Sequence, residues 1–285
     1  MRIKLVTFSD GSYALRAAGK RLVNQADSTG WFDHPSEHWT LETLRNKMPD
    51  FFHTHRKFIE MNPKGFGFWI WQPAILSYLI DRLEDDEMVL LLDAGCQLNS
   101  NNESNLRFKS YIEMCKSSGL LLTQLANSSI DSENLTDAAL TKLSVLNLLD
   151  PLEVFRNTNQ IQSGIIFAIK SEKSQHVVKK WFDYCVHSDY SLLTDPTSTD
   201  SQLDEFRGHR HGQSILSLIA KSEGVIPLKD ETWFSPDWTV GLRFPIWAMR
   251  NRTGGDVFRR NPIDILKLLI ARVEHRILIS YREKF

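Results

Sequence analysis

The chain has 285 residues, 42% of them hydrophobic and 24% charged, and its 34 Lys and Arg against 35 Asp and Glu give a formal net charge of -1. This is the composition of a soluble globular protein, so it excludes a disordered chain and collagen. The 3 Cys, at positions 96, 115 and 185, have no disulfide-scaffold or zinc-site spacing and indicate a reducing compartment.

Apolar and β-favouring runs alternate along the chain with segments of helical periodicity. In chain order, we expect strands at residues 3–8, 87–93, 120–123, 165–169 and 225–228, and helices at residues 13–23, 53–61, 74–83, 108–116, 172–186 and 213–221. Pro73 would stand in the first turn of the helix at residues 74–83. This alternation predicts an α/β fold, with a mostly parallel sheet that helices cover on both faces.

Charge is distributed unevenly. Residues 243–285 carry ten Lys and Arg against four Asp and Glu, net +6, which leaves 24 against 31 for residues 1–242. We predict one α/β domain over residues 1–242 and a basic helical segment over residues 243–285. Apolar residues recur on one face of that segment from Ile263 to Ile277. The helix could lie on an anionic membrane surface, or it could pack on the domain with its basic side in solvent.

The sequence also indicates where the protein is located and which partners it has. No apolar run is long enough to span a membrane, and no secretion signal precedes the first expected strand. We therefore expect a cytoplasmic protein, peripheral at the inner membrane face if the basic helix contacts lipid. Aromatic residues are not interleaved with Lys and Arg as on a single-strand-binding surface, so no nucleic acid is expected as a partner.

Asp93 is the first candidate for chemistry. It directly follows an apolar run, and ligands of parallel sheets bind beyond the carboxyl ends of the strands. Its carboxylate could hold a divalent metal or a ribose hydroxyl there, although such an Asp is also a common turn former. Gly95, two residues later, would permit close backbone approach to a ligand.

Residues 64–73 place two glycines among four aromatic residues. Glycine weakens a strand, and these aromatics do not follow one face, so the segment is unusual for simple core. Trp69 and Trp71 could offer flat faces to a sugar or a base. The alternative is an aromatic core beneath a loop.

Residues 206–214 combine two histidines, two arginines and a glutamine just before an expected helix. Such a cluster suits an anionic or hydroxyl-rich ligand, and His209 and His211 could also serve a metal. The alternative is a solvated polar loop.

Four motifs in this order resemble those of GT-A-fold glycosyltransferases, the nucleotide-diphospho-sugar transferases of bacterial and viral glycan assembly. They are Gly-Phe-Gly-Phe-Trp-Ile-Trp-Gln-Pro, Leu-Leu-Leu-Asp-Ala-Gly-Cys, Ile-Gln-Ser-Gly-Ile-Ile-Phe and His-Arg-His-Gly-Gln-Ser. The resemblance spans residues 1–230 and implies a GT-A-like, Rossmann-like sheet in a single domain.

The resemblance also assigns residues. Asp93 would take the first place of the family's Asp-x-Asp motif, which holds the metal and the donor diphosphate, and Gln162 and Gln213 would be catalytic amides at the donor sugar. Besides Asp93, the residues expected to bind the donor are Thr7, Phe8, Asp10, Lys64, Trp69, Trp71, Ala94, Gly95, Ser163, Gly164, Arg207, His209, Arg210 and His211.

The sequence departs from the family pattern twice. Gly95 stands in place of the second Asp, and Gly212 in place of the Asp that usually precedes Gln213. Mn²⁺ or Mg²⁺ at Asp93 would therefore need further ligands from His209, His211 or the phosphates. Alternatively, a basic side chain neutralises the diphosphate without a metal, the candidates being Lys64, Arg207 and Arg210.

The activity that the resemblance implies is that of a hexosyl- or pentosyltransferase. The enzyme would move a sugar from a UDP- or GDP-sugar to a hydroxyl of a glycan or glycolipid, such as a surface polysaccharide or lipopolysaccharide. The alternative is a catalytically silent module that binds a nucleotide sugar or a glycan. The catalytic base stays open among Asp204, Glu205, Asp230 and Asp237.

Overall fold

A computed structural model describes residues 1–126, 134–235 and 237–255. Its main sheet has five strands in the order β2-β1-β3-β6-β5. These strands are β1 (Arg2–Phe8), β2 (Glu37–Trp39), β3 (Glu87–Asp93), β5 (Leu120–Gln124) and β6 (Ile161–Ile169). β1 is parallel to β2 and β3, whereas β6 is antiparallel to both β3 and β5. The predicted α/β fold with a mostly parallel sheet is confirmed.

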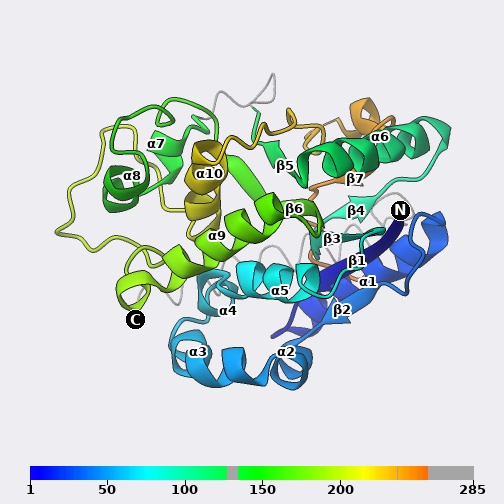
Figure 1. The fold of residues 1–285 in the computed structure, drawn as a ribbon, viewed down its shortest axis with the longest axis horizontal. Helices are drawn as coiled ribbons and strands as arrows, with labels where there is room; N and C mark the ends of the chain where they lie inside the picture. The colour runs from blue at the N-terminus through cyan, green and yellow to red at the C-terminus, as the bar shows by residue number, and fades with distance from the viewer. Residues whose placement is uncertain (127–133, 236, 256–285) are drawn as a thin grey trace.

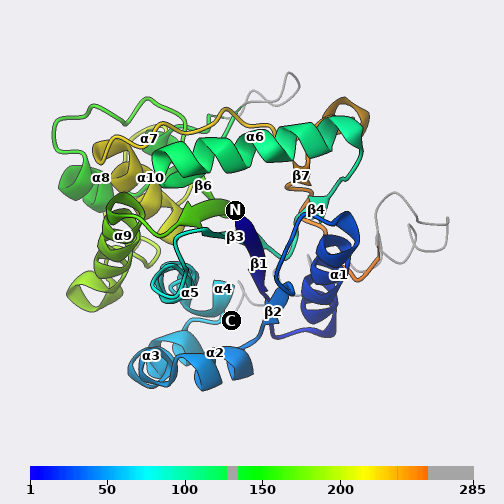
Figure 2. The same cartoon turned by 45° about the vertical axis from the view of Figure 1, so that its right-hand side comes forward.

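Helices cover both faces of this sheet (Figures 1 and 2). α1 (Tyr13–Thr29) and α6 (Asn102–Ser118) lie on one face, and α5 (Trp71–Ile80), α9 (Glu172–Tyr190) and α10 (Gly212–Ser222) lie on the other. The other helices of the described residues are α2 (Leu41–Lys47), α3 (Pro49–Met61), α4 (Gly65–Phe68), α7 (Asp137–Leu140), α8 (Leu143–Leu149) and the 3-10 helix η1 (Trp238–Gly241). The long helices begin at side-chain caps, which satisfy free N–H groups of the first turn, from Ser12, Asn101 and Ser171.

The core follows from the strand pattern. Along β3, Leu90 and Leu92 pack with the α1 and α6 side, while Val89 and Leu91 pack with the α5 and α9 side. A strand buried on both faces is apolar throughout, which explains the continuous run before Asp93. Truncating one such leucine to alanine is expected to cost about 2–5 kcal/mol of stability.

Most predicted elements are present, and one is wrong. The strand expected at residues 225–228 is reduced to a single bridge between Leu228 and Thr123. Several short elements were not predicted, among them β2 and the two-stranded sheet of β4 (Gln97–Leu98) and β7 (Ile246–Trp247). Strands of two or three residues owe their pairing to tertiary contacts, so they leave little periodic pattern in the sequence.

Residues beyond 242 are partly described. β7 pairs with β4, so residues 246–247 belong to the body of the fold. The helix expected over residues 263–277 lies outside the described residues. No helix in the described ranges is long and apolar enough to cross a membrane.

Candidate functional site

One end of the main sheet gathers the candidate residues. β1 and β3 finish there side by side, with Phe8 opposite Asp93, and Thr123 of β5 pairs with Gln162 of β6. Because β6 is antiparallel, its amino end, residues 162–164, lies beside the carboxyl end of β3. We call this region the Asp93 end of the sheet.

Asp93 has polar neighbours, but its carboxylate accepts few hydrogen bonds from them. Gln72, in the first turn of α5, donates from Nε2 to Asp93 Oδ1 at 3.2 Å and accepts at Oε1 from Ser163 Oγ at 3.0 Å. A Cβ at position 164 would lie 2.7 Å from Asp93 Oδ2, so glycine is needed there for the carboxylate to fit. Burial raises the pKa of Asp93, while the Gln72 bond and the charges of Arg252 and Arg250 act against that rise.

The two glutamines expected to face the donor sugar make bonds within the protein. Gln213 at the start of α10 accepts the Ser163 N–H at 3.2 Å and donates to Gln160 Oε1 at 2.6 Å. Gln162 donates to Thr232 Oγ1 at 3.1 Å. Both side chains are therefore positioned at the Asp93 end, and each amide keeps further hydrogen-bonding capacity.

The residues at the end of β1, predicted to bind the donor, mainly contact other parts of the protein. Thr7 is fully buried, with no hydrogen-bond partner at its Oγ1 among the described residues. The Phe8 ring packs against Trp71 at 4.3 Å and Phe66 at 5.6 Å between centroids. Asp10 accepts the N–H groups of Leu41 and Gly11 and a bond from Arg16, and these bonds lower its pKa despite partial burial.

Residues 64–73 show features of both alternatives considered for them, an aromatic core beneath a loop and a ligand-binding segment. Trp71 is buried beneath the loop and donates from Nε1 to the Gly65 carbonyl at 2.9 Å, as an aromatic core would. Phe66, Phe68 and Trp69, in contrast, have left-handed φ angles of 56°, 52° and 64°. Such conformations are unfavourable for residues with a side chain, and they concentrate at functional sites.

The histidine cluster lies against this strained loop. The His211 ring stacks on Phe68 at 4.4 Å and Trp69 at 5.7 Å. Its Nδ1 bonds the Leu193 carbonyl at 2.8 Å, and its Nε2 lies 3.6 Å from Asp195 Oδ1, beyond hydrogen-bonding distance. Burial lowers the pKa of His211 to about 4.

The other basic residues of this region are placed by backbone contacts and ion pairs. His209 is buried, bonds the Leu192 carbonyl at 2.9 Å and has a pKa well below its usual range because of burial. Lys64 pairs with Asp195 at 3.1 Å. The N–H groups of Arg207 and Arg210 bond the carbonyls of α7, and both residues are exposed.

The site thus contains two neighbouring groups. The first is Asp93 with Ser163, Gly164 and the two glutamines, and the second is Lys64 with Trp69 and the histidines. The chain connects them, because Gln72 comes three positions after Trp69 and Gln213 comes two positions after His211.

A loop that sequence reasoning did not assign completes the Asp93 end. The Asn251 N–H bonds the Gly95 carbonyl at 2.8 Å. The buried Arg21 of α1 donates to the carbonyls of Ala94, Cys96 and Asn251 at 2.8, 2.9 and 3.3 Å. These bonds hold residues 94–96 and 250–253 together, and no local signal in the sequence announces them.

Three residues of the site were missed from the sequence. Gln72 lies within the aromatic segment of residues 64–73 and is the polar residue of an apolar helix start, a signal that could have marked it. Arg21 and Arg250 carry no comparable signal, because their positions depend on contacts across more than 70 residues.

A divalent metal does not fit the donor set described. Across residues 1–126, 134–235 and 237–255, no group of three His, Cys, Asp or Glu side chains could hold one. Asp93 is a lone carboxylate in the field of two arginines, whereas Mg²⁺ and Mn²⁺ prefer several oxygen ligands.

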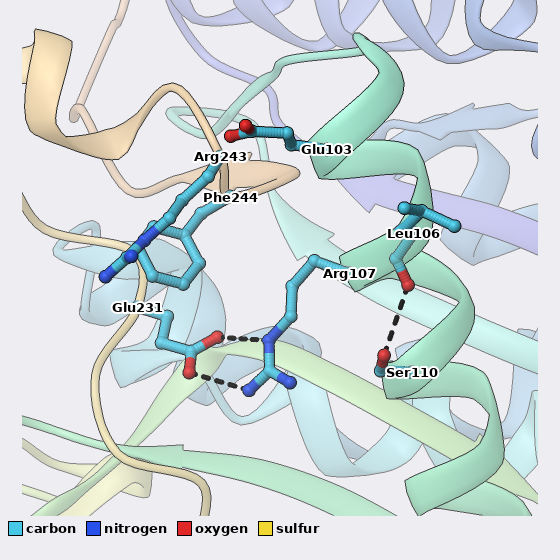
Figure 3. Close-up of a pocket in the computed structure, with 7 residues that line it drawn as sticks. All are labelled: Glu103, Leu106, Arg107, Ser110, Glu231, Arg243 and Phe244. Carbon is cyan, nitrogen blue, oxygen red and sulfur yellow. Dashed lines mark hydrogen bonds and ion pairs between the residues drawn. The ribbon is translucent and has the colours of Figure 1, made fainter.

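An open groove of about 650 Å³ lies elsewhere, between α6 and the residues Glu231, Arg243 and Phe244 (Figure 3). The ion pair of Arg107 with Glu231 lines it, and Arg243 and Phe244 lie opposite α6. We call it the α6 groove. None of the site residues predicted from the sequence lines it.

No family model matches the chain, and no curated protein matches it. Three solved structures are similar to it. Mouse xyloside xylosyltransferase 1 is 10% identical with a TM-score of 0.42, over 92% of this chain and 100% of that one. A glycosyltransferase involved in the glycosylation of the major capsid of PBCV-1 is 11% identical with a TM-score of 0.43, over 87% and 92%.

The third structure is the WbbM bifunctional glycosyltransferase, 13% identical with a TM-score of 0.44. Its match covers 85% of this chain and 43% of that chain, so this chain spans less than half of that protein. All three are described as glycosyltransferases, the class that the sequence motifs resemble.

Proposed function

We propose that the protein is a glycosyltransferase that moves a sugar from a nucleoside-diphosphate donor to a hydroxyl of a glycan or glycolipid. The observation that carries this proposal is the position of Asp93, with an incompletely bonded carboxylate among Gln72, Ser163 and Gly164 at the carboxyl end of β3. Ligands of such sheets bind at this end. The motifs that resemble glycosyltransferases converge on the same place.

The chemistry needs two kinds of group. During transfer, the bond from the anomeric carbon to the phosphate oxygen breaks, and its electron pair leaves with the nucleoside diphosphate. The acceptor oxygen bonds the anomeric carbon and loses its proton to a base. Cationic and hydrogen-bonding groups stabilise the leaving diphosphate, and polar groups such as Asp93, Gln162 and Gln213 hold the sugar hydroxyls.

Of the four carboxylates considered as the base, Asp230 is linked to the site. It accepts bonds from the Thr232 N–H and hydroxyl at 2.8 and 2.7 Å, and Thr232 in turn bonds Gln162. Burial raises the pKa of Asp230, which brings the carboxyl closer to the range useful in proton transfer. Asp204, Glu205 and Asp237 are exposed.

The test is a panel of nucleotide sugars, with two measurements on the full chain. Binding is followed by the melting temperature, and turnover by release of nucleoside diphosphate with and without glycan acceptors. Asp93→Asn should abolish turnover. Asp85→Asn changes an exposed aspartate in the turn just before the same strand; it is the matched control and should behave as wild type.

The results separate the two functions under consideration. Turnover of a nucleotide sugar supports the transferase. Binding without turnover, by hydrolysis or transfer, would instead support a silent binding module, which the glycine at position 95 makes reasonable. If no nucleotide sugar either raises the melting temperature or is turned over, the proposed function is wrong.

A further inference from the structure

The position of the absent second carboxylate is occupied by another part of the chain. A Cβ at Gly95 would lie 3.2 Å from Arg250 Cα and 3.4 Å from its carbonyl carbon, tighter than most real contacts. The Asn251 N–H bonds the Gly95 carbonyl at 2.8 Å. The backbone of residues 250–251 therefore covers this place, and an acidic side chain would not fit without moving it.

The covering loop is fixed to the site by buried bonds. Arg21 joins the carbonyls of Ala94, Cys96 and Asn251 and also donates from Nε to the Thr253 carbonyl at 3.2 Å. β7, just before the loop, pairs with β4, just after Asp93. The position of Arg250 relative to Asp93 is thus set by the folded backbone.

Arg250 is held in an unusual conformation. Its φ is 53°, in the left-handed region, which costs a residue with a side chain about 1–3 kcal/mol unless its surroundings impose it. The residue is exposed, and its guanidinium lies 5.4 Å from the centre of the Trp233 ring. Trp233 comes directly after Thr232, the partner of Gln162, and Arg250 comes directly before Asn251, which bonds Gly95. The backbones that carry both residues are therefore tied to the Asp93 end.

The charge balance of the site matches this geometry. Where the family pattern would bring a second carboxylate, this chain brings two arginines, Arg252 and Arg250, whose charges act on Asp93. A guanidinium binds phosphate through two parallel hydrogen bonds and stays charged at every physiological pH. A lone Asp93 carboxylate would repel a diphosphate, and it is better suited to accept hydrogen bonds from sugar or ribose hydroxyls.

We propose that Arg250, stacked on Trp233, holds the diphosphate of the donor and takes the place of a divalent metal. This inference rests on the proposed function. When the bond to the sugar breaks, Arg250 donates hydrogen bonds to the phosphate oxygens that gain charge, and it transfers neither a proton nor an electron.

The experiment measures the affinity of the full chain for UDP and GDP by calorimetry, with EDTA and then with Mn²⁺. Four proteins are compared: wild type, Arg250→Asn, Arg250→Lys and Arg82→Ala. Asn removes the charge but tolerates a left-handed φ, so the loop should keep its fold. Arg82 is the matched control, because it is an exposed arginine stacked on Tyr78 at 3.6 Å, at the far end of α5.

Wild type should bind the same diphosphate with equal affinity in EDTA and in Mn²⁺. Arg250→Asn should weaken this binding by about 10- to 100-fold, the range for a charge-assisted hydrogen bond, and leave the weaker binding of the free nucleoside unchanged. Arg250→Lys should recover part of the loss, and Arg82→Ala should bind as wild type. A purely structural role would weaken nucleoside and diphosphate alike.

Two results would overturn the inference while the proposed function stands: diphosphate binding that EDTA removes, or an Arg250→Asn protein that turns over a donor and binds its diphosphate as wild type does. If wild type neither binds nor turns over any nucleotide sugar, the proposed function fails, and this inference fails with it.

Discussion

The α6 groove and the Asp93 end of the sheet both contain a carboxylate and arginines. The two carboxylates differ in the number of hydrogen bonds that they accept from the protein. In the groove, Glu231 accepts two bonds from Arg107, at 2.7 and 2.6 Å, and a third from the Tyr111 hydroxyl at 2.7 Å. Asp93 accepts one long bond from Gln72, at 3.2 Å. The groove is an open cavity, yet its carboxylate already accepts three bonds from the protein. Hydrogen-bonding capacity that the fold leaves unused indicates a ligand better than cavity volume does.

The largest effect should come from Asp93. Asp93→Asn keeps the shape of the side chain and removes its charge, and we expect turnover to fall by about 100- to 1,000-fold, as for loss of a group that acts in the transition state. Burial raises the pKa of Asp93, so keeping its carboxylate charged in the folded state opposes folding. The variant should therefore melt at the same temperature as wild type or above it, as calorimetry at pH 7 can show.

A smaller loss is expected when the space beside the carboxylate is filled. In Gly164→Ala, the new Cβ would stand 2.7 Å from Asp93 Oδ2 and displace it. A displacement of about 1 Å can cost roughly 100-fold in rate, so kcat should fall on that scale. Gly212→Ala is the matched control, because its Cβ would meet Trp181 at an ordinary 3.6 Å. Equal kcat values for the two variants would contradict this view of the site.

Substitutions in the α6 groove should lower the stability of the protein and leave its turnover unchanged. Glu231→Ala leaves Arg107 and Tyr111 without their acceptor, and the free energy of unfolding should fall by about 1–3 kcal/mol. In a double-mutant cycle, Arg107→Ala should cost less in the Glu231→Ala background than in wild type. A Glu231→Ala protein with wild-type stability but slow turnover would reverse the comparison and place chemistry in the groove.

The last prediction concerns the dependence of stability on pH. The folded state lowers the pKa of His211 from 6.5 to about 4, so between these values the unfolded chain binds more protons. The stability contributed by the neutral ring is complete above pH 6.5 and is lost as the pH falls toward 4, by on the order of 3 kcal/mol. His211→Phe keeps the stack on Phe68 and should flatten this part of the stability curve. Burial lowers the pKa of His209 too, so some slope should remain.

Much of the fold was predictable because its central elements carry strong patterns. The apolar run before Asp93 and the helical periodicities of α6, α9 and α10 define strands and helices without further information. The direction of β6 was not predictable. Nothing in residues 161–169 distinguishes an antiparallel from a parallel strand, yet only the antiparallel direction places Ser163 and Gly164 beside Asp93.

The sequence predicted where several site residues lie, but it did not predict their hydrogen-bond partners. The strand-end rule marked Asp93, whereas the family resemblance assigned Ser163 and Gln213. The sequence could not show that His209 and His211 bond to carbonyls of residues 192–193, because backbone acceptors have no sequence signature. It also could not place Arg250, whose loop meets Gly95 through contacts across more than 150 residues.

Arg21 joins parts of the chain that must find one another during folding. Its partners Ala94 and Asn251 are 73 and 230 positions away, so the Asp93 end can be complete only after the early and late parts of the chain have met. Contacts between such distant positions form against a large loop-closure entropy and slow folding. A substitution at Arg21 should therefore behave as a folding defect whose visible symptom is lost activity, although the residue itself touches no substrate in the proposed reaction.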